Sequence, residues 1–182
     1  EPVNYLFHTI VTCVLFKGTE RHTILDKKDF SRDIVENVEN TMVFLQQHLK
    51  LRYEITSLRR KEILEIPEIA LREAVINAVC HRDYFEKGAN VLVAIFDDRV
   101  EITNPGGLPK GLSSKDFGKK SISRNPIIAS LFQRNGYIEK MGTGISRIRT
   151  AAKESGIQEP VFSFDTFFTV EFPREIPDAE EK

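Results

Sequence analysis

The segment Glu73-Ala-Val-Ile-Asn77-Ala-Val-Cys-His81-Arg-Asp83-Tyr84 is the part of the chain from which the fold is best predicted. Glu73, Asn77 and His81 recur at every fourth position, which places their side chains on one stripe of a helix. The opposite stripe is apolar and contains Leu71, Val75, Ala78 and Val79. The pattern predicts a helix that packs one face on a core and presents a carboxylate, an amide and an imidazole on the other.

The polar stripe has two interpretations. A carboxylate one helical turn from a carboxamide suits Mg²⁺, which takes oxygen ligands and keeps part of its water shell. Polar side chains on the outer face of an amphipathic helix are, however, ordinarily just solvated. The stripe alone favours the second interpretation, so the remaining sequence has to decide.

Composition narrows the class of protein. The 182 residues are 41% hydrophobic and 29% charged, as expected for one globular domain or one and a half. A net charge of -1 argues against a global basic field for nucleic acid but leaves a local patch open. No apolar run approaches the roughly 20 residues of a membrane span, so no membrane partner is expected.

Cys13 and Cys80 form no metal-binding pattern and predict reduced thiols in a cytoplasmic protein. Because the chain begins at Glu1 without Met, we expect it to be part of a longer protein.

Hydrophobic periodicity and turn residues predict the other elements. Strands are expected at 6–17, 51–65, 90–96, 99–103, 161–164 and 167–172, with 23–26 as a short strand or an extended connection. The strand at 51–65 is expected to break at a turn formed by Arg59-Arg60-Lys61. Further helices are expected from Asp29 or Ser31 to about Lys50, at 126–133 with Asn125 as cap, and after Gly144 with Arg147 facing outward. The pattern predicts an α+β two-layer sandwich with helices on one face of a mixed sheet.

Two glycine motifs follow the central helix. Asn104-Pro-Gly-Gly-Leu-Pro109 ends a strand, and its glycines would let a ligand ring approach the main chain, although a plain loop fits equally well. Gly142-Thr143-Gly144 precedes a helix whose free N–H groups suit a phosphate, although a tight loop is the default interpretation. Residues 110–125 are polar and basic and are expected to form a mobile loop or lid.

The order of these features resembles the GHKL superfamily of ATP-binding domains, which includes gyrase B, MutL and sensor histidine kinases. The three motifs Ala-Leu-Arg-Glu-Ala-Val-Ile-Asn-Ala-Val-Cys-His-Arg-Asp-Tyr, Asn-Pro-Gly-Gly-Leu-Pro and Lys-Met-Gly-Thr-Gly-Ile resemble a narrower group more closely. That group is the histidine-kinase-like ATPase domain behind AlbA-type (Schlafen-like) DNA-binding domains of predicted transcriptional regulators, related to the C-terminal part of a DNA helicase. The resemblance covers residues 51–173. Residues 1–50 would then lead in from a preceding domain, and residues 174–182 would form a charged tail.

The resemblance implies a Bergerat-type fold that binds ATP and Mg²⁺. In this family Asn77 would hold Mg²⁺ against the phosphates, and Glu73 would polarise the attacking water where ATP is hydrolysed. The positions implied to bind the nucleotide are Asn77, His81, Asp83, Asn104, Gly106, Gly107, Arg124, Gly142, Thr143 and Gly144. Among these, the first glycine motif would place the adenine and the second would cradle the phosphates. Residues 110–140 would form the ATP lid, whereas His81 and Asp83 match the narrower group without a settled role.

One departure from the superfamily limits the functional prediction. Asn104 stands where the superfamily has an Asp that accepts a hydrogen bond from the adenine amino group, and an amide oxygen still accepts that bond without the charge. We therefore expect a Mg²⁺–ATP-binding regulatory domain with slow hydrolysis at most. The alternative is a degenerate fold that serves as a dimerisation or interaction scaffold. DNA contact is expected through neighbouring domains, and a homodimer is a further possibility.

Overall fold

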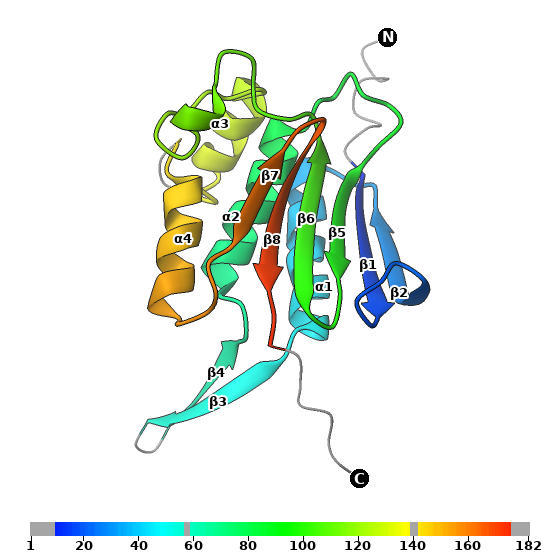
Figure 1. Cartoon of the computed structure of the whole chain (residues 1–182), viewed down its shortest axis with the longest axis vertical. Coiled ribbons are helices and arrows are strands. Elements are labelled where there is room, and N and C mark those ends of the chain that lie inside the picture. The colour runs from blue at the N-terminus through cyan, green and yellow to red at the C-terminus, as the bar shows by residue number, and fades with distance from the viewer. Residues whose placement is uncertain (1–9, 57–58, 139–141, 176–182) are drawn as a thin grey trace.

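The computed structural model describes residues 10–56, 59–138 and 142–175, and their core is a six-stranded sheet covered by helices on one face (Figure 1). The strand order is β2-β1-β5-β6-β8-β7, in which β1 and β5 are parallel and all other neighbours are antiparallel. The strands are β1 (Val11–Lys17), β2 (Thr23–Phe30), β5 (Val91–Ile95), β6 (Arg99–Pro105), β7 (Val161–Phe164) and β8 (Phe167–Pro173). The predicted α+β sandwich with a mixed sheet is confirmed.

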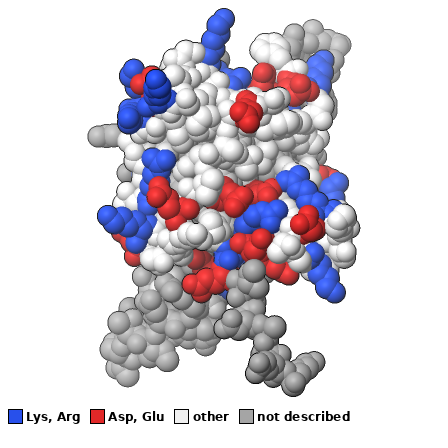
Figure 2. All heavy atoms as spheres, viewed as in Figure 1, with Lys and Arg blue, Asp and Glu red and all other residues white. Residues whose placement is uncertain are grey.

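Alternation along the strands separates the two faces of the sheet. On β1, Val11 and Cys13 belong to the main core beneath the helices, while Val14 and Phe16 belong to a small cluster on the opposite face. In that cluster the rings of Phe16 and Phe96 stack at 4.9 Å, and the guanidinium of Arg99 lies 3.9 Å above the Phe96 ring. The face seen in Figure 2 carries acidic and basic side chains intermixed, so it offers no large area of one sign.

The helix α1 (Ile34–His48) starts later than the sequence predicts. Its N-cap is Asp33, whose side chain accepts hydrogen bonds from the N–H groups of Val35 and Glu36. Asp29 is unavailable as a cap because β2 continues to Phe30 and pairs with β1 along its length. Pairing with β1 therefore decides where the helix begins.

The segment after α1 forms a separate hairpin that projects from the body of the molecule (Figure 1). Its strands are β3 (Leu51–Thr56) and β4 (Arg59–Leu64). The triplet Arg59-Arg60-Lys61 was predicted to be the turn, but it opens β4 and pairs with residues 54–56. Residues 57 and 58, between the two strands, lie outside the described residues.

The helix α2 (Glu68–His81) is the central element of the covered face. Its predicted apolar stripe is confirmed, because Leu71, Val75, Ala78 and Val79 are all at most 3% exposed. The opposite stripe is also enclosed, since α2 packs against α4 (Gly144–Glu154) as well as against the sheet. Glu73 is only 3% exposed, which excludes the interpretation that its carboxylate is simply solvated. None of the helices in the described part of the chain has the length and apolar character needed to cross a membrane.

Candidate functional site

The polar stripe of α2 meets the first turn of α4. A Cβ placed on Gly144 would lie 2.7 Å from Nδ2 of Asn77 and 3.2 Å from Oε2 of Glu73. Any side chain at position 144 would have to displace the Asn77 amide, so the glycine allows the start of α4 to lie directly against this amide. The packing therefore brings a carboxylate, an amide and a helix N-terminus into contact.

Glu73 forms an ion pair across this contact. Nη1 of Arg147 lies 2.8 Å from Oε1 of Glu73, and the Glu73 side chain is 4% exposed while that of Arg147 is 24% exposed. The prediction that Arg147 faces outward is therefore wrong. Helical spacing does not show which side of α4 meets α2, and a buried carboxylate requires a cation nearby.

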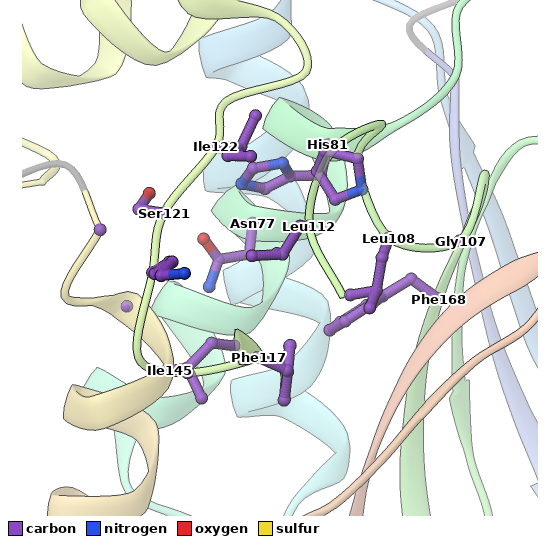
Figure 3. Close-up of a pocket in the computed structure, with 15 residues that line it drawn as sticks. Asn77, His81, Gly107, Leu108, Leu112, Phe117, Ser121, Ile122, Ile145 and Phe168 are labelled. Carbon is purple, nitrogen blue, oxygen red and sulfur yellow. The ribbon is translucent and has the colours of Figure 1, made fainter. Parts of the chain in front are cut away.

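A cavity of about 90 Å³ opens beside this contact (Figure 3). Asn77 and His81 reach it from α2, Gly107 from the end of β6, and Gly142 and Gly144 from the start of α4. Much of its wall is apolar and was not predicted from the sequence: Leu108, Pro109, Leu112, Phe117, Ile122, Ile145 and Phe168. The sequence signal for this wall was the set of three apolar residues, Leu112, Phe117 and Ile122, within the largely polar stretch 110–125.

The segment predicted to be a lid lies over the cavity. It includes a short turn, η2 (Ser114–Asp116), and the next residue, Phe117, packs its ring against Phe162, Phe164 and Phe168 at 5.3, 4.9 and 5.8 Å between centroids. Ligand pockets usually enclose roughly 300–1,000 Å³, several times the volume found here. The lid must therefore move outward before a nucleotide could enter.

Within the lid, Ser121 lies against the second glycine motif. A Cβ on Gly142, whose φ is +90°, would lie 2.7 Å from the Cβ of Ser121. Thr143 is the residue preceding α4, and its carbonyl accepts a hydrogen bond from the N–H of Arg147. The phosphate-binding motif predicted by resemblance is thus at the start of a helix and at the edge of the cavity, as the sequence implied.

His81 is held neutral in the cavity wall. Burial, and then the positive charge of Arg124, lower the pKa of His81 to about 4. Its Nδ1 is buried and has no hydrogen-bond partner within the described part of the chain. At neutral pH the ring therefore offers the cavity an uncharged donor or acceptor.

Arg124 fastens the end of the lid to the first glycine motif. Its Nη2 donates to the carbonyl of Gly107 at 2.9 Å, and its Nη1 lies 3.6 Å from a carboxylate oxygen of Asp83. Gly106, at φ +93°, would bring a Cβ within 3.1 Å of both Arg124 and Asp83. These four predicted residues are therefore brought together, in a cluster next to the cavity.

Asn104 lies behind the cavity and does not line it. Alternation on β6 places it with Val100 and Ile102 on the side of the sheet that faces the helices. It is fully buried, and its Nδ2 donates to the carbonyl of Pro105 at 3.2 Å. Its Oδ1 has no hydrogen-bond partner among the described residues. A buried unpaired acceptor is costly, and it suits an N–H donor such as an amino group of a base.

Other residues of the motif around His81 have structural roles that the sequence did not reveal. Buried Arg82 donates to the carbonyl of Ala89 at 2.7 Å, and the hydroxyl of Tyr84 donates to the carbonyl of Val79 at 3.0 Å. Asn125 is the N-cap residue of α3 (Pro126–Arg134), as predicted, but its side chain makes no capping hydrogen bond and donates to the carbonyls of Cys80 and Arg82 at 2.9 and 2.8 Å. Its side chain thus satisfies the C-terminal end of α2, which fixes the position of His81.

The donor set fits a magnesium ion that arrives with phosphates. The described residues contain no cluster of three or more His, Cys, Asp or Glu that could hold a metal. Mg²⁺ bound with a nucleotide needs only one or two protein oxygens, since phosphates and water supply the rest. The Asn77 amide oxygen at the edge of the cavity meets that requirement.

Comparisons with known proteins agree with this geometry. Residues 88–172 match the family described as "Putative ATP-dependent DNA helicase recG C-terminal". The resemblance is to an ATPase-like domain. The matched segment contains both glycine motifs and the lid but begins after α2, which carries Glu73, Asn77 and His81.

The fold is similar to that of a solved structure, the DIP2311 protein from Corynebacterium diphtheriae. The TM-score is 0.82 at 23% sequence identity, and the match covers 95% of this chain and 36% of that chain. The similarity shows a shared fold, and this chain spans about a third of the length of the matched protein. No curated protein matches the sequence.

Proposed function

We propose that this domain binds ATP together with Mg²⁺. The observation that carries the proposal is the contact of Asn77 and Glu73 with the glycine start of α4 at the edge of an apolar cavity. An amide oxygen and a helix N-terminus suit a metal-bound phosphate. An apolar wall suits the base of the nucleotide. The ATPase-like match over residues 88–172 supports the same ligand.

Each predicted residue has a place in this proposal. Asn77 would hold the Mg²⁺, which neutralises phosphate charge, while the main chain at Gly142, Thr143 and Gly144 would face the phosphates. The unpaired Oδ1 of Asn104 would accept a hydrogen bond from the base once the lid has opened. Arg124 and Asp83 hold the glycine loop in place for that contact.

Hydrolysis is the slower part of the proposed function. Glu73 would take a proton from a water molecule aligned with the terminal phosphate, which is general-base catalysis with positioning as its main component. In the closed structure the same carboxylate is engaged by Arg147, which is consistent with slow turnover.

The proposed biological setting is a DNA-binding transcriptional regulator in the cytoplasm. Residues 51–173 would be its nucleotide-binding domain, to which residues 1–50 contribute β1, β2 and α1, two strands of the same sheet and a helix of the layer that covers it. The reference to a DNA helicase in the matched family supports a link to DNA, which neighbouring domains would contact. Nucleotide binding would control the DNA-bound or dimeric state of the larger protein.

A second candidate is a scaffold that has lost its ligand. The observation in its favour is the cavity of about 90 Å³, which the lid closes through Phe117 and Ser121. In that case the domain would serve dimerisation or protein interaction without binding a nucleotide.

Titration calorimetry with Mg²⁺ and ATP separates the two candidates. We expect micromolar binding to the wild-type chain and a loss of at least tenfold in Asn77→Ala, because the removed oxygen is a metal ligand. The matched control is Gln46→Ala, which removes an amide from the exposed face of α1 and leaves affinity unchanged. No binding at millimolar ATP would overturn the nucleotide proposal in favour of the scaffold.

A further inference from the structure

We propose that Arg147 recognises the terminal phosphate of the nucleotide and, on doing so, releases Glu73 to act on water. This inference rests on the proposed function and adds a residue that the motifs do not contain. The ion pair seen in the structure would then be the resting state of a switch with two alternative partners for one guanidinium.

The geometry places Arg147 beside Glu73 at the start of α4. It lies in the first turn of α4, where its N–H donates to the carbonyl of Thr143 at 2.9 Å. Its Nη1 is 2.8 Å from Glu73, and Glu73 Oε2 lies 3.2 Å from the Cβ position of Gly144. The Glu73 carboxylate therefore touches the Arg147 guanidinium with one oxygen and lies beside Gly144, whose main chain is proposed to face the phosphates, with the other.

Exposure differs between the two members of the pair. The Glu73 side chain is 4% exposed, whereas the Arg147 side chain is 24% exposed. The Arg147 side chain therefore reaches solvent, from which a ligand would enter, whereas the Glu73 carboxylate is enclosed between α2 and α4. A partly exposed guanidinium beside a buried carboxylate is the arrangement that an exchange of partners requires.

The electrostatics of α4 also favour exchange. A cation in the first turn of a helix lies at the positive end of the helix dipole, which is unfavourable. The first turn of α4 contains no acidic residue, so Glu73 from α2 supplies a counter-charge. A triphosphate would supply more negative charge, and a guanidinium binds phosphate oxygens through two parallel hydrogen bonds.

The consequence for chemistry concerns only nucleoside triphosphates, whose terminal phosphate is the γ-phosphate. Once Arg147 has turned to that phosphate, the Glu73 carboxylate can accept a proton from water. The water oxygen then bonds to the terminal phosphorus as the bond to the bridging oxygen breaks, yielding ADP and inorganic phosphate. ADP lacks the γ-phosphate, so with ADP bound Arg147 would remain on Glu73.

The test compares the dissociation constants of Mg²⁺–ATP and Mg²⁺–ADP. In Arg147→Gln we expect ATP affinity to fall roughly ten- to a hundredfold, the loss typical of one charged hydrogen bond, with ADP affinity changed less than threefold. Lys153→Gln removes a cation from the exposed last turn of the same helix and should change neither constant. Arg147→Lys keeps the charge but cannot form the two parallel hydrogen bonds, so it should lower the preference for ATP several-fold.

The outcomes distinguish this inference from the proposed function. If wild type binds both nucleotides and Arg147→Gln weakens both equally, or neither, Arg147 only stabilises Glu73 and the inference is overturned. If wild type binds neither nucleotide, the proposed function fails and the inference fails with it. Thermal unfolding of each variant checks that the fold is kept. If Arg147→Gln is unfolded, the ratio of ATP affinity to ADP affinity in Arg147→Lys decides instead. A ratio equal to that of wild type, despite the altered geometry of the cation, would overturn a specific phosphate contact.

Discussion

His81 shows how burial gives a side chain a role that its sequence position leaves open. It sits at the foot of α2, where Asn125 holds the helix end and Arg124 adds a positive charge nearby. Both burial and that charge disfavour the imidazolium. The neutral ring is therefore part of the cavity wall at the pH of a cell.

This neutrality predicts a pH dependence of stability. Above pH 6.5 His81 is uncharged in both the folded and the unfolded chain, so its effect on stability is constant. Between pH 6.5 and about 4 the unfolded chain binds a proton that the folded chain resists, so the free energy of unfolding falls as the pH is lowered. We expect His81→Gln to remove up to roughly 3 kcal/mol of that fall, measured by urea unfolding at pH 7 and pH 4.5.

The control for this measurement is His22→Gln, which changes an exposed histidine in the connection between β1 and β2. In this variant the free energy of unfolding should fall between pH 7 and pH 4.5 by the same amount as in wild type. If His81→Gln also loses as much free energy of unfolding between the two pH values as wild type, protonation of His81 does not cause the pH dependence.

At the scale of elements, the segment between β6 and α3 is held shut by one aromatic residue. Phe117 inserts among three phenylalanines of β7 and β8, while Arg124 fixes the far end of the segment. If a nucleotide binds only when this segment opens, its apparent affinity is reduced by the fraction of molecules that are open. A substitution that weakens the packing of Phe117 should therefore strengthen nucleotide binding.

Phe117→Ala tests this relation. We expect several-fold tighter Mg²⁺–ATP binding and faster proteolytic cleavage within residues 110–123, because truncating a packed phenylalanine costs about 3 kcal/mol or more. Phe85→Ala is the matched control, since Phe85 is 93% exposed and its loss should change neither quantity. Weaker binding by Phe117→Ala would mean that the ring contacts the nucleotide instead of excluding it.

At the scale of the whole molecule, Arg174 joins three distant parts of the chain at the end of β8. Its side chain is 7% exposed, pairs with Glu65 at 2.8 Å just before α2, and donates to the carbonyl of Phe96. Its N–H donates to the carbonyl of Asp98 at 2.7 Å, in the turn between β5 and β6. The contact ties the last strand to the segment that leads into the central helix.

Arg174→Ala should therefore destabilise the entire fold. Breaking a buried pair leaves Glu65 without its cation, and we expect a loss of about 3 kcal/mol, measured as a lower urea midpoint with an unchanged slope. Arg134→Ala, at the exposed end of α3, should shift the midpoint little. Equal small shifts in both variants would show that Arg174 is only a surface contact.

The sequence by itself determined the α+β class, the positions of most elements, and the stripe of Glu73, Asn77 and His81 on one helix. These features follow from local rules, because periods of two and of nearly four residues mark strand and helix faces. It also placed the second glycine motif at a helix start, where the structure brings Gly144 against Asn77.

Only the tertiary structure decided what those residues touch. Arg147 bonds Glu73, Asn125 caps α2, and Phe117 closes the cavity because of how α4, α3 and the lid pack around α2. The start of α1 at Asp33 likewise depends on strand pairing between β1 and β2. Partners separated by tens of residues in the chain leave no periodic signal, since the contact is fixed by packing and charge compensation between elements.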